Sequence, residues 1–251
     1  MTSALATSDL SIRFGAFEAV RQVSLAIRPG ARHALIGPNG AGKTTLVNAL
    51  TGSLKPTAGR IMLAGEDATH LSEAQRVHKG LVRTFQINQL FANLSVLDNV
   101  WLAVLERNRR TGIFWRSARA DRAALDEARS CLEFVHLLPL ADQLVATLPY
   151  GSRRLLEIAL AMAARPSVLV LDEPAAGVPA ADSEAIFERI HALPDSLTLV
   201  FIEHDMRLVF RFAERITVLV AGQVLTEGTP ADIAANPQVR EVYLGRRGAH
   251  A

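Results

Sequence analysis

The sequence predicts an α/β protein with a parallel β-sheet core and a helical subdomain inserted into that core. Two observations carry this expectation. Continuous apolar runs of strand length alternate with helix-like segments, which is typical of a parallel sheet covered by helices on both faces. The middle of the chain, about 87–162, follows a helical pattern instead and interrupts the series of strands.

The first part of the chain reads as strands separated by turns. Segments 10–15 and 20–27 alternate apolar and polar residues, as half-buried strands do. The run 32–37 is a third strand, which leads through a glycine-rich loop into a helix that we expect to end at Gly52. Segment 59–67 predicts a further strand and a turn.

Two capping signals indicate where the next helices begin. Ser72 with Gln75 has the spacing of a capping box for a short helix. Ser95 with Asp98 indicates the start of a longer helix.

The helical pattern continues to about Arg165, and we expect breaks near Pro139 and Pro149 because proline interrupts a helix. Strand patterns then resume in four segments: 167–172, 197–203, 216–222 and 223–228.

Composition argues against several classes of protein. Lys and Arg number 27 against 25 Asp and Glu, so the net charge of +2 gives no general case for nucleic-acid binding. The one cysteine, Cys131, cannot form an internal disulfide. The sequence has no signal-peptide pattern and no apolar run of the roughly 20 residues that cross a bilayer. We expect a cytoplasmic protein that reaches a membrane only through a partner.

The stretch GPNGAGKT, Gly37 to Thr44, matches the phosphate-binding loop G-x-x-x-x-G-K-[ST] between a strand and a helix. In such a loop the backbone N–H groups and the helix N-terminus surround phosphate oxygens. We expect Lys43 to reach the β- and γ-phosphates of ATP and Thr44 to bind Mg²⁺. An ordinary glycine turn before a helix is the alternative. The candidate nucleotide-binding residues here are Gly37, Pro38, Asn39, Gly40, Ala41, Gly42, Lys43, Thr44 and Thr45.

The stretch VLVLDEP, 168–174, supplies two acids at the end of an apolar strand. Ligands of α/β proteins bind at that end of a strand. Asp172 is therefore a candidate Mg²⁺ ligand, and Glu173 is placed to polarise an attacking water. The alternative is a strand that ends in two solvated acids.

These motifs, with LPYGSRR at 148–154 between them and FIEHD at 201–205 after them, resemble the ATP-binding cassette (ABC) ATPases over nearly the whole chain. The resemblance implies a single domain with an N-terminal antiparallel β subdomain. In that domain about 1–86 and 163–251 form the α/β core, and about 87–162 form the helical subdomain.

The resemblance also assigns roles outside the two motifs. Gln86 falls at the Q-loop glutamine, a catalytic residue and Mg²⁺ ligand, and His204 falls at the switch histidine. Phe14 falls where an aromatic residue stacks on adenine, and 175–182 occupies the D-loop. Phe14 as a core residue and His204 as a structural histidine are the alternatives.

The family signature Leu-Ser-Gly-Gly-Gln is altered at 148–152. Leu148 and Gly151 match its first and fourth positions, whereas Pro149, Tyr150 and Ser152 depart from it. Family members form head-to-tail dimers in which this segment faces the γ-phosphate bound by the partner. Pro149 removes a hydroxyl and an N–H, while Ser152 is expected to cap the following helix. We expect a complete ATP site in this chain and a weakened contribution to the partner's site.

Three longer stretches of sequence indicate a subfamily within the ABC ATPases. RTFQINQLFANLSVLDNV, LDEPAAGV and the tail NPQVREVYLG are similar to the larger ATPase of branched-chain amino acid importers, whose relatives also serve importers of urea, short amides and aromatic acids. The alternatives are a weakly or non-hydrolytic partner subunit, a lipopolysaccharide-export ATPase, and a soluble ABC ATPase of DNA repair or translation. The single cassette without a long heptad region argues against the last.

The resemblance implies four kinds of contact: a second ABC ATPase subunit, integral membrane permeases, a solute-binding protein indirectly, and the inner face of the cell membrane. The arginine-rich segment 107–122 is either a solvated loop or a contact with the membrane or a permease, and nucleic acid is the less favoured reading. The sequence does not name the solute, because the permease and the binding protein select it.

Overall fold

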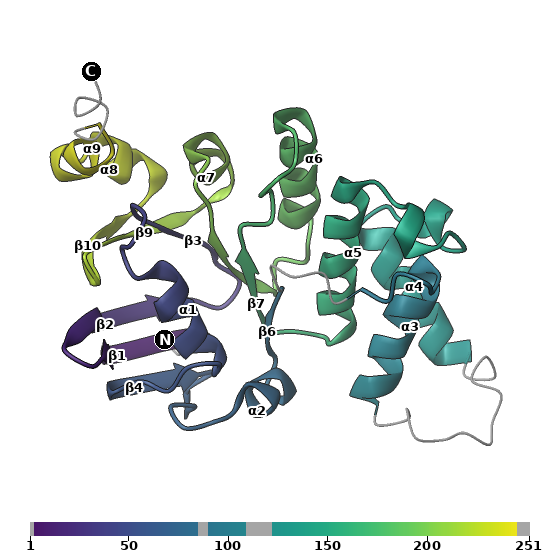
Figure 1. The fold of residues 1–251 in the computed structure, drawn as a ribbon, viewed down its shortest axis with the longest axis horizontal. Helices are drawn as coiled ribbons and strands as arrows, with labels where there is room; N and C mark the ends of the chain where they lie inside the picture. Colours follow the sequence, from purple (N-terminus) through teal and green to yellow (C-terminus); the bar gives the residue numbers. More distant parts are fainter. Residues whose placement is uncertain (1–2, 85–89, 109–121, 245–251) are drawn as a thin grey trace. The chain divides into compact units, whose positions relative to one another are not determined.

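The computed structural model describes residues 3–84, 90–108 and 122–244 (Figure 1). The chain divides into two compact units. Unit 1 comprises Met1–Leu81, Ser167–Glu173 and Pro194–Ala251, and unit 2 comprises Val82–Pro166 and Pro174–Leu193.

One sheet of unit 1 is antiparallel, with strand order β2-β1-β4-β5. Its strands are β1 (Leu5–Phe14), β2 (Phe17–Ile27), β4 (Ala58–Leu63) and β5 (Glu66–Asp67). β1 starts earlier than the strand predicted at 10–15, because it pairs with both β2 and β4 from Leu5 onward. The antiparallel N-terminal subdomain expected from the resemblance is present.

The other sheet has the order β10-β9-β3-β8-β7-β6. Its strands are β3 (Arg32–Ile36), β6 (Leu81–Arg83), β7 (Val168–Asp172), β8 (Thr198–Ile202), β9 (Arg215–Val220) and β10 (Gln223–Gly228). The pairs β9-β3, β3-β8 and β8-β7 are parallel, as predicted, and every residue of β3, β7 and β8 is buried. A turn reverses the chain between β9 and β10, and these two strands pair antiparallel.

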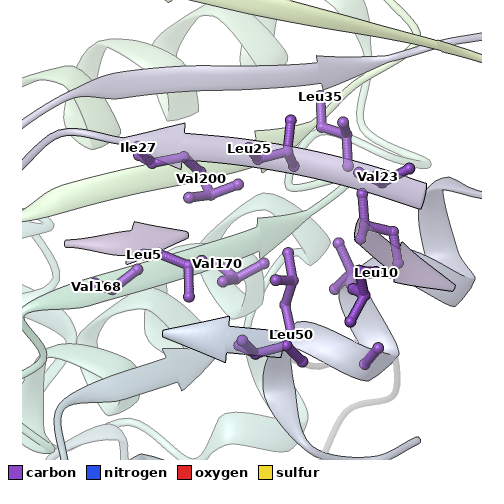
Figure 2. Packing of buried hydrophobic residues seen from close by; sticks show 14 of the residues in the cluster. Leu5, Leu10, Val23, Leu25, Ile27, Leu35, Leu50, Val168, Val170 and Val200 are labelled. Atoms are coloured by element: carbon purple, nitrogen blue, oxygen red, sulfur yellow. The ribbon is translucent and has the colours of Figure 1, made fainter. Parts of the chain in front are cut away.

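A buried apolar cluster lies between these two sheets and α1 (Lys43–Thr51). Figure 2 shows side chains of the cluster from both sheets, among them Leu5 and Val23 from the antiparallel sheet and Val170 and Val200 from the parallel one. Leu50 of α1 is 1 % exposed in the same cluster. Because burying such a side chain stabilises the fold by about 1.5–3 kcal/mol, the cluster holds α1 firmly in place.

The capping signals in the first part of the chain are confirmed. α1 ends at Thr51, and Gly52 follows it with a left-handed φ of 91°. α2 (Glu73–His78) starts with a complete capping box made by Ser72 and Gln75. α3 (Val96–Arg107) is capped by Ser95, which accepts a hydrogen bond from the Asp98 N–H over 3.0 Å.

Unit 2 is helical. α3, α4 (Arg122–Phe134) and α5 (Tyr150–Ala163) pack together around buried Val100, Val104, Leu132 and Leu156. Two short 3₁₀ turns, η2 (Leu138–Leu140) and η3 (Val145–Thr147), connect α4 to α5. α6 (Ala180–His191) packs against α5.

The start of α5 corrects one prediction. Ser152 was expected to cap this helix, but the helix already begins at Tyr150, and Pro149 is its N-cap residue without a side-chain hydrogen bond. Pro149 has a φ of −56° and a ψ of 154°, an extended conformation that ends directly before the helix. Ser152 therefore lies inside the first turn, where its side chain cannot act as an N-cap.

Unit 1 is completed by α7 (Met206–Phe212), α8 (Pro230–Ala235) and α9 (Pro237–Leu244). Among the described residues, no helix combines the length and the apolar character that crossing a membrane requires.

Candidate nucleotide-binding site

The predicted phosphate-binding loop connects buried strand β3 to α1, as the motif requires. Two of its glycines are needed because other backbone groups lie close to them. A Cβ on Gly37 would lie 2.2 Å from the carbonyl oxygen of Leu219, and a Cβ on Gly42 would lie 2.5 Å from that of Ala19. Gly42 also has a left-handed φ of 97° directly before the helix. The loop therefore has the close-packed glycine backbone that a phosphate cradle needs.

Lys43 places its positively charged ammonium group inside this loop. Its ammonium group donates hydrogen bonds to the carbonyl oxygens of Gly37 (2.7 Å) and Pro38 (3.1 Å), and the residue is only 7 % exposed. Burial lowers the pKa of Lys43, and the charges of Glu173 and Asp172 act in the opposite direction. A partly desolvated ammonium beside a glycine loop favours an anionic ligand, because such a ligand offsets the cost of burying the charge.

The two acids at the end of β7 lie in different environments. Asp172 is 3 % exposed, whereas the side chain of Glu173 is 27 % exposed. Glu173 has a φ of 49°, which is uncommon for a residue other than glycine. Its N–H donates to the carbonyl oxygen of Ile202 at the end of the neighbouring strand β8, over 3.1 Å. This bond holds the backbone in a sparsely populated conformation, as is frequent at functional sites.

His204 follows β8 and contacts Glu173 directly. Its Nε2 lies 2.6 Å from Glu173 Oε1, and its side chain is 48 % exposed. Buried Glu203 accepts hydrogen bonds from the N–H groups of His204 (2.8 Å) and Asp205 (3.4 Å) and so orders the turn that carries the histidine. Sequence reasoning missed Glu203, although an acid at the end of a buried strand was a visible signal.

The remaining predicted residues of this site lie as follows. Thr44 is exposed in the first turn of α1, and Thr45 beside it is half-buried. Phe14 at the end of β1 is 52 % exposed, so its alternative assignment as a core residue is wrong. Its stacking on adenine stays a prediction. Gln86 lies outside the described residues, as do residues 109–121 of the arginine-rich segment.

The donors present fit MgATP. The Thr44 hydroxyl and the Asp172 carboxylate are hard oxygen ligands of the kind Mg²⁺ takes. Over residues 3–84, 90–108 and 122–244, no three His, Cys, Asp or Glu side chains converge as a metal-binding group. That is compatible with Mg²⁺, which is commonly held by one or two protein groups together with substrate phosphates and water.

The C-terminal helix α9 contributes a contact that sequence reasoning did not anticipate. The hydroxyl of Tyr243 lies near enough to the backbone of Gly37, the first residue of the phosphate loop, for that backbone to lower its pKa. Burial is the larger influence and raises the pKa of Tyr243 to about 12. In the sequence, Tyr243 stands out only as part of the tail NPQVREVYLG.

The altered signature lies in unit 2. Leu148 is 3 % exposed and precedes the N-cap Pro149. Gly151 is in the first turn of α5, and, its own helix backbone and chain neighbours aside, a Cβ on it would meet no described atom within 4 Å. The first N–H to bond within the helix is that of Arg153, which donates to the Pro149 carbonyl oxygen over 3.1 Å. The N–H groups before it are those that helix geometry leaves for capping groups or ligands.

Comparison with known proteins identifies matches over most of the chain. Residues 20–176 match the family model "ABC transporter", and residues 223–249 match "Branched-chain amino acid ATP-binding cassette transporter". The high-affinity branched-chain amino acid transport ATP-binding protein LivG of Salmonella typhimurium is 42 % identical over 96 % of this chain and 97 % of its own length. The corresponding protein BraF of Pseudomonas aeruginosa is 41 % identical over the same shares of the two chains.

Solved structures agree. An ATP-binding cassette of an ABC transporter in its ADP conformation superposes with a TM-score of 0.86 at 31 % identity, covering 98 % of this chain and 100 % of the other. A nucleotide-free cassette gives a TM-score of 0.83 at 31 % identity and covers 97 % and 99 % of the two chains.

Proposed function

The chain belongs to the ABC transporter ATP-binding family, and from this premise we propose that it hydrolyses ATP to energise a membrane importer of branched-chain amino acids or a related small polar solute. The names of its relatives, LivG and BraF, support this solute class, as does the match of residues 223–249 to the branched-chain amino acid cassette model. The ADP-bound conformation of a similar cassette supports nucleotide as the ligand.

One observation carries the proposal. Within unit 1, Lys43 in its glycine loop is electrostatically coupled to Asp172 and Glu173, and Glu173 is in turn bonded to His204. This is the set that ATP hydrolysis needs: a cradle for the phosphates, a cation for the β- and γ-phosphates, and a carboxylate that can orient water.

Each group has a defined task. The loop N–H groups and Lys43 bind the phosphates and neutralise their charge. Glu173 accepts a hydrogen bond from the attacking water, and His204 holds the Glu173 carboxylate in place over 2.6 Å. Mg²⁺ bound by Thr44 and Asp172 would polarise the phosphoryl oxygens. Gln86 and Phe14 complete the proposed site, as catalytic metal ligand and adenine platform.

The proposed partners follow from the site and the family. A second ABC ATPase subunit, identical or different, completes each ATP site from outside, and integral permeases hold the pair at the inner face of the membrane. A solute-binding protein delivers the solute to those permeases. In this dimer the altered signature would contribute less to the partner's ATP site, because Pro149 offers no hydroxyl, although the N-terminus of α5 remains.

The proposal is tested by reconstitution. The chain is purified together with candidate partner ATPase and permease subunits, and ATP-dependent uptake of labelled leucine into vesicles is measured together with ATP hydrolysis. Lys43→Ala should abolish both, while Lys55→Ala, which changes an exposed lysine of the same unit, should leave both unchanged. Hydrolysis by the Lys43 variant within about twofold of wild type would reject the assignment, given the several-kcal/mol loss expected.

The other candidate functions give different outcomes in the same assay. A non-hydrolytic partner subunit would leave ATP hydrolysis unchanged when Glu173→Gln is introduced in this chain alone. An ATPase of a lipopolysaccharide exporter would fail to support leucine uptake and would copurify with a different permease pair.

The altered signature has its own test. Pro149→Ser with Ser152→Gln should restore a hydroxyl facing the partner's γ-phosphate, because the helix start and its N–H groups are already in place. With Glu173→Gln in this chain, only the partner's site turns over, and its rate should rise roughly tenfold, equivalent to about 1.4 kcal/mol. No change would show that the backbone and the helix dipole already serve the γ-phosphate fully.

A further inference from the structure

Tyr150, one of the three residues that depart from the family signature, contacts the loop that follows β7. Its side chain is 42 % exposed, yet its hydroxyl donates a hydrogen bond to the carbonyl oxygen of Ala176 over 3.1 Å. Ala176 belongs to residues 174–178, called here the connecting loop because they join Glu173 to the segment that begins α6. Tyr150 thus links the start of α5 to the connecting loop within unit 2.

The ring of Tyr150 also packs against this loop. A Cβ on Gly177 would lie 3.4 Å from the Tyr150 hydroxyl oxygen and 3.6 Å from two ring carbons, so the ring borders the space beside this glycine. Gly177 has a φ of 75°, which L side chains rarely adopt. The loop therefore meets Tyr150 through one hydrogen bond to Ala176, and the ring lies beside Gly177.

The Tyr150 ring is also contacted by a residue of its own helix, α5. The guanidinium of Arg154, one turn later, lies 5.3 Å from the centre of the Tyr150 ring. Arg154 pairs with Glu157 over 2.9 Å, and the two side chains are only 9 % and 10 % exposed. Since a buried pair of this kind holds its geometry closely, it fixes the ring from the side of α5.

The connecting loop is short and attached at both ends. Inside it, the Val178 N–H donates to the Ala175 carbonyl oxygen over 3.2 Å. At its far end the Ser183 hydroxyl of α6 donates to the Val178 carbonyl oxygen over 3.2 Å. At its near end it is bonded directly to Glu173, so the peptide bond after Glu173 is where the chain passes from unit 1 to unit 2. A displacement of the loop must therefore change the backbone conformation that places Glu173.

We propose that Tyr150 is a positioning residue that couples the signature segment to Glu173 of the same chain through the connecting loop. This inference rests on the proposed function, in which the start of α5 meets the ATP of the partner. When that ATP orders the signature segment, Tyr150 carries the change to Ala176 and Gly177, and the loop sets Glu173 in its own site. The residue that departs from the family signature thereby makes hydrolysis in one site sensitive to occupancy of the other.

A serine or glycine at this position would have neither the length nor the ring to make these contacts. The coupling is thus a property of this chain's own sequence at 150, together with Arg154 and Gly177. It acts within one subunit, which distinguishes it from the direct contact between a signature and the ATP of the partner.

The test removes only the hydroxyl, with Tyr150→Phe. Dimers are assembled in which the other subunit carries the glutamate-to-glutamine change equivalent to Glu173→Gln, so that only the site of the Tyr150 variant turns over. The signature facing that site comes from the other subunit, where it is unchanged, so any change in rate arises within the variant chain. The matched control is Phe134→Leu, which alters another exposed aromatic residue of unit 2.

Tyr150→Phe should lower kcat of its own site by about 3- to 10-fold, the effect of one hydrogen bond to a neutral group, with an unchanged KM for ATP because the phosphate loop is untouched. Phe134→Leu should leave both parameters as in wild type, and thermal unfolding should be alike for all three proteins. The reciprocal dimer, with Glu173→Gln in the variant chain, reports on the partner's site.

The rates of the two dimers distinguish coupling within the variant chain from an effect on the partner's site alone. A loss of kcat in the variant's own site supports the coupling. A loss confined to the partner's site would show that Tyr150 acts only as part of the signature, and unchanged rates in both dimers would show that it positions nothing; either result overturns the inference. If the wild-type dimer itself does not hydrolyse ATP, it is the proposed function that fails.

Discussion

The contact between His204 and Glu173 allows a sharp test of how this site works. If His204 acts by holding the Glu173 carboxylate, the two residues form one unit, and losing either should remove the same step. If each acts on the reaction independently, their effects should add. A double-mutant cycle with His204→Ala and Glu173→Gln distinguishes these cases.

The structure sets the expected magnitudes. A hydrogen bond to a charged group contributes about 1.5–3 kcal/mol. The contact here is short, 2.6 Å, but the two side chains are 48 % and 27 % exposed, so solvent screens it and the lower half of that range applies. His204→Ala should therefore slow hydrolysis by at least about tenfold, and Glu173→Gln by about 10²–10⁴-fold as a lost water-positioning base.

The decisive number is the effect of His204→Ala when Glu173→Gln is already present. Acting through Glu173, the histidine should then cost less than about threefold, so the coupling should exceed the roughly 0.5 kcal/mol within which independent sites add. The assay is single-turnover hydrolysis of bound ATP by the assembled dimer, with His78→Ala as the control because His78 is an exposed histidine of the same unit. A full tenfold loss in both backgrounds would refute the positioning role.

Three further outcomes follow from the contacts described. Tyr243→Phe removes the hydroxyl that lies beside the backbone of Gly37 and should weaken ATP binding by about 2- to 10-fold in a fluorescent-nucleotide titration, and an unchanged affinity would show that this hydroxyl does not support the loop. Glu173→Gln should bind MgATP, hydrolyse it very slowly and elute as an ATP-dependent dimer in size-exclusion chromatography, alone or with its partner ATPase; a monomer in both cases would count against the sandwich. Burial lowers the pKa of His33 to about 4, so below pH 6.5 the folded state binds fewer protons than the unfolded chain. The free energy of unfolding, measured with urea, should therefore fall by up to about 3 kcal/mol between pH 6.5 and 4, and His33→Gln should reduce this fall.

Local signals in the sequence predicted the parts of the molecule that local chemistry determines. The G-x-x-x-x-G-K-[ST] stretch predicted the loop because Gly37 and Gly42 meet backbone atoms that exclude a side chain. Ser72 and Gln75 predicted α2 because a capping box acts within one turn. The apolar runs predicted the parallel strands because β3, β7 and β8 are buried throughout.

Features that depend on distant segments were not predictable in this way. Tyr243 meets Gly37 across some two hundred residues of sequence, and nothing near Tyr243 indicates that contact. The role of Ser152 was misjudged because a serine before an apolar helix is a common N-cap, whereas the extended conformation of Pro149 starts the helix two residues earlier. β1 extends back to Leu5 because two neighbouring strands pair with it, which its own sequence does not show.

Glu173 lies at the boundary between the two units of the chain, and this position bears on the role of the altered signature. The backbone of Glu173 is held in unit 1 by its bond to Ile202 and by an uncommon φ of 49°, while the next residue, Pro174, already belongs to unit 2. Proline there fixes its own φ, so little freedom remains between the glutamate and the loop that Tyr150 contacts. A residue held in a sparsely populated conformation by one hydrogen bond is sensitive to small forces from its neighbour in the chain. In the proposed mechanism the Glu173 carboxylate lies next to the point where the chain passes into unit 2, so a movement of the connecting loop would change its position. Tyr150 adds a contact with that loop, whereas Pro149 has no hydroxyl to offer to the ATP of the partner.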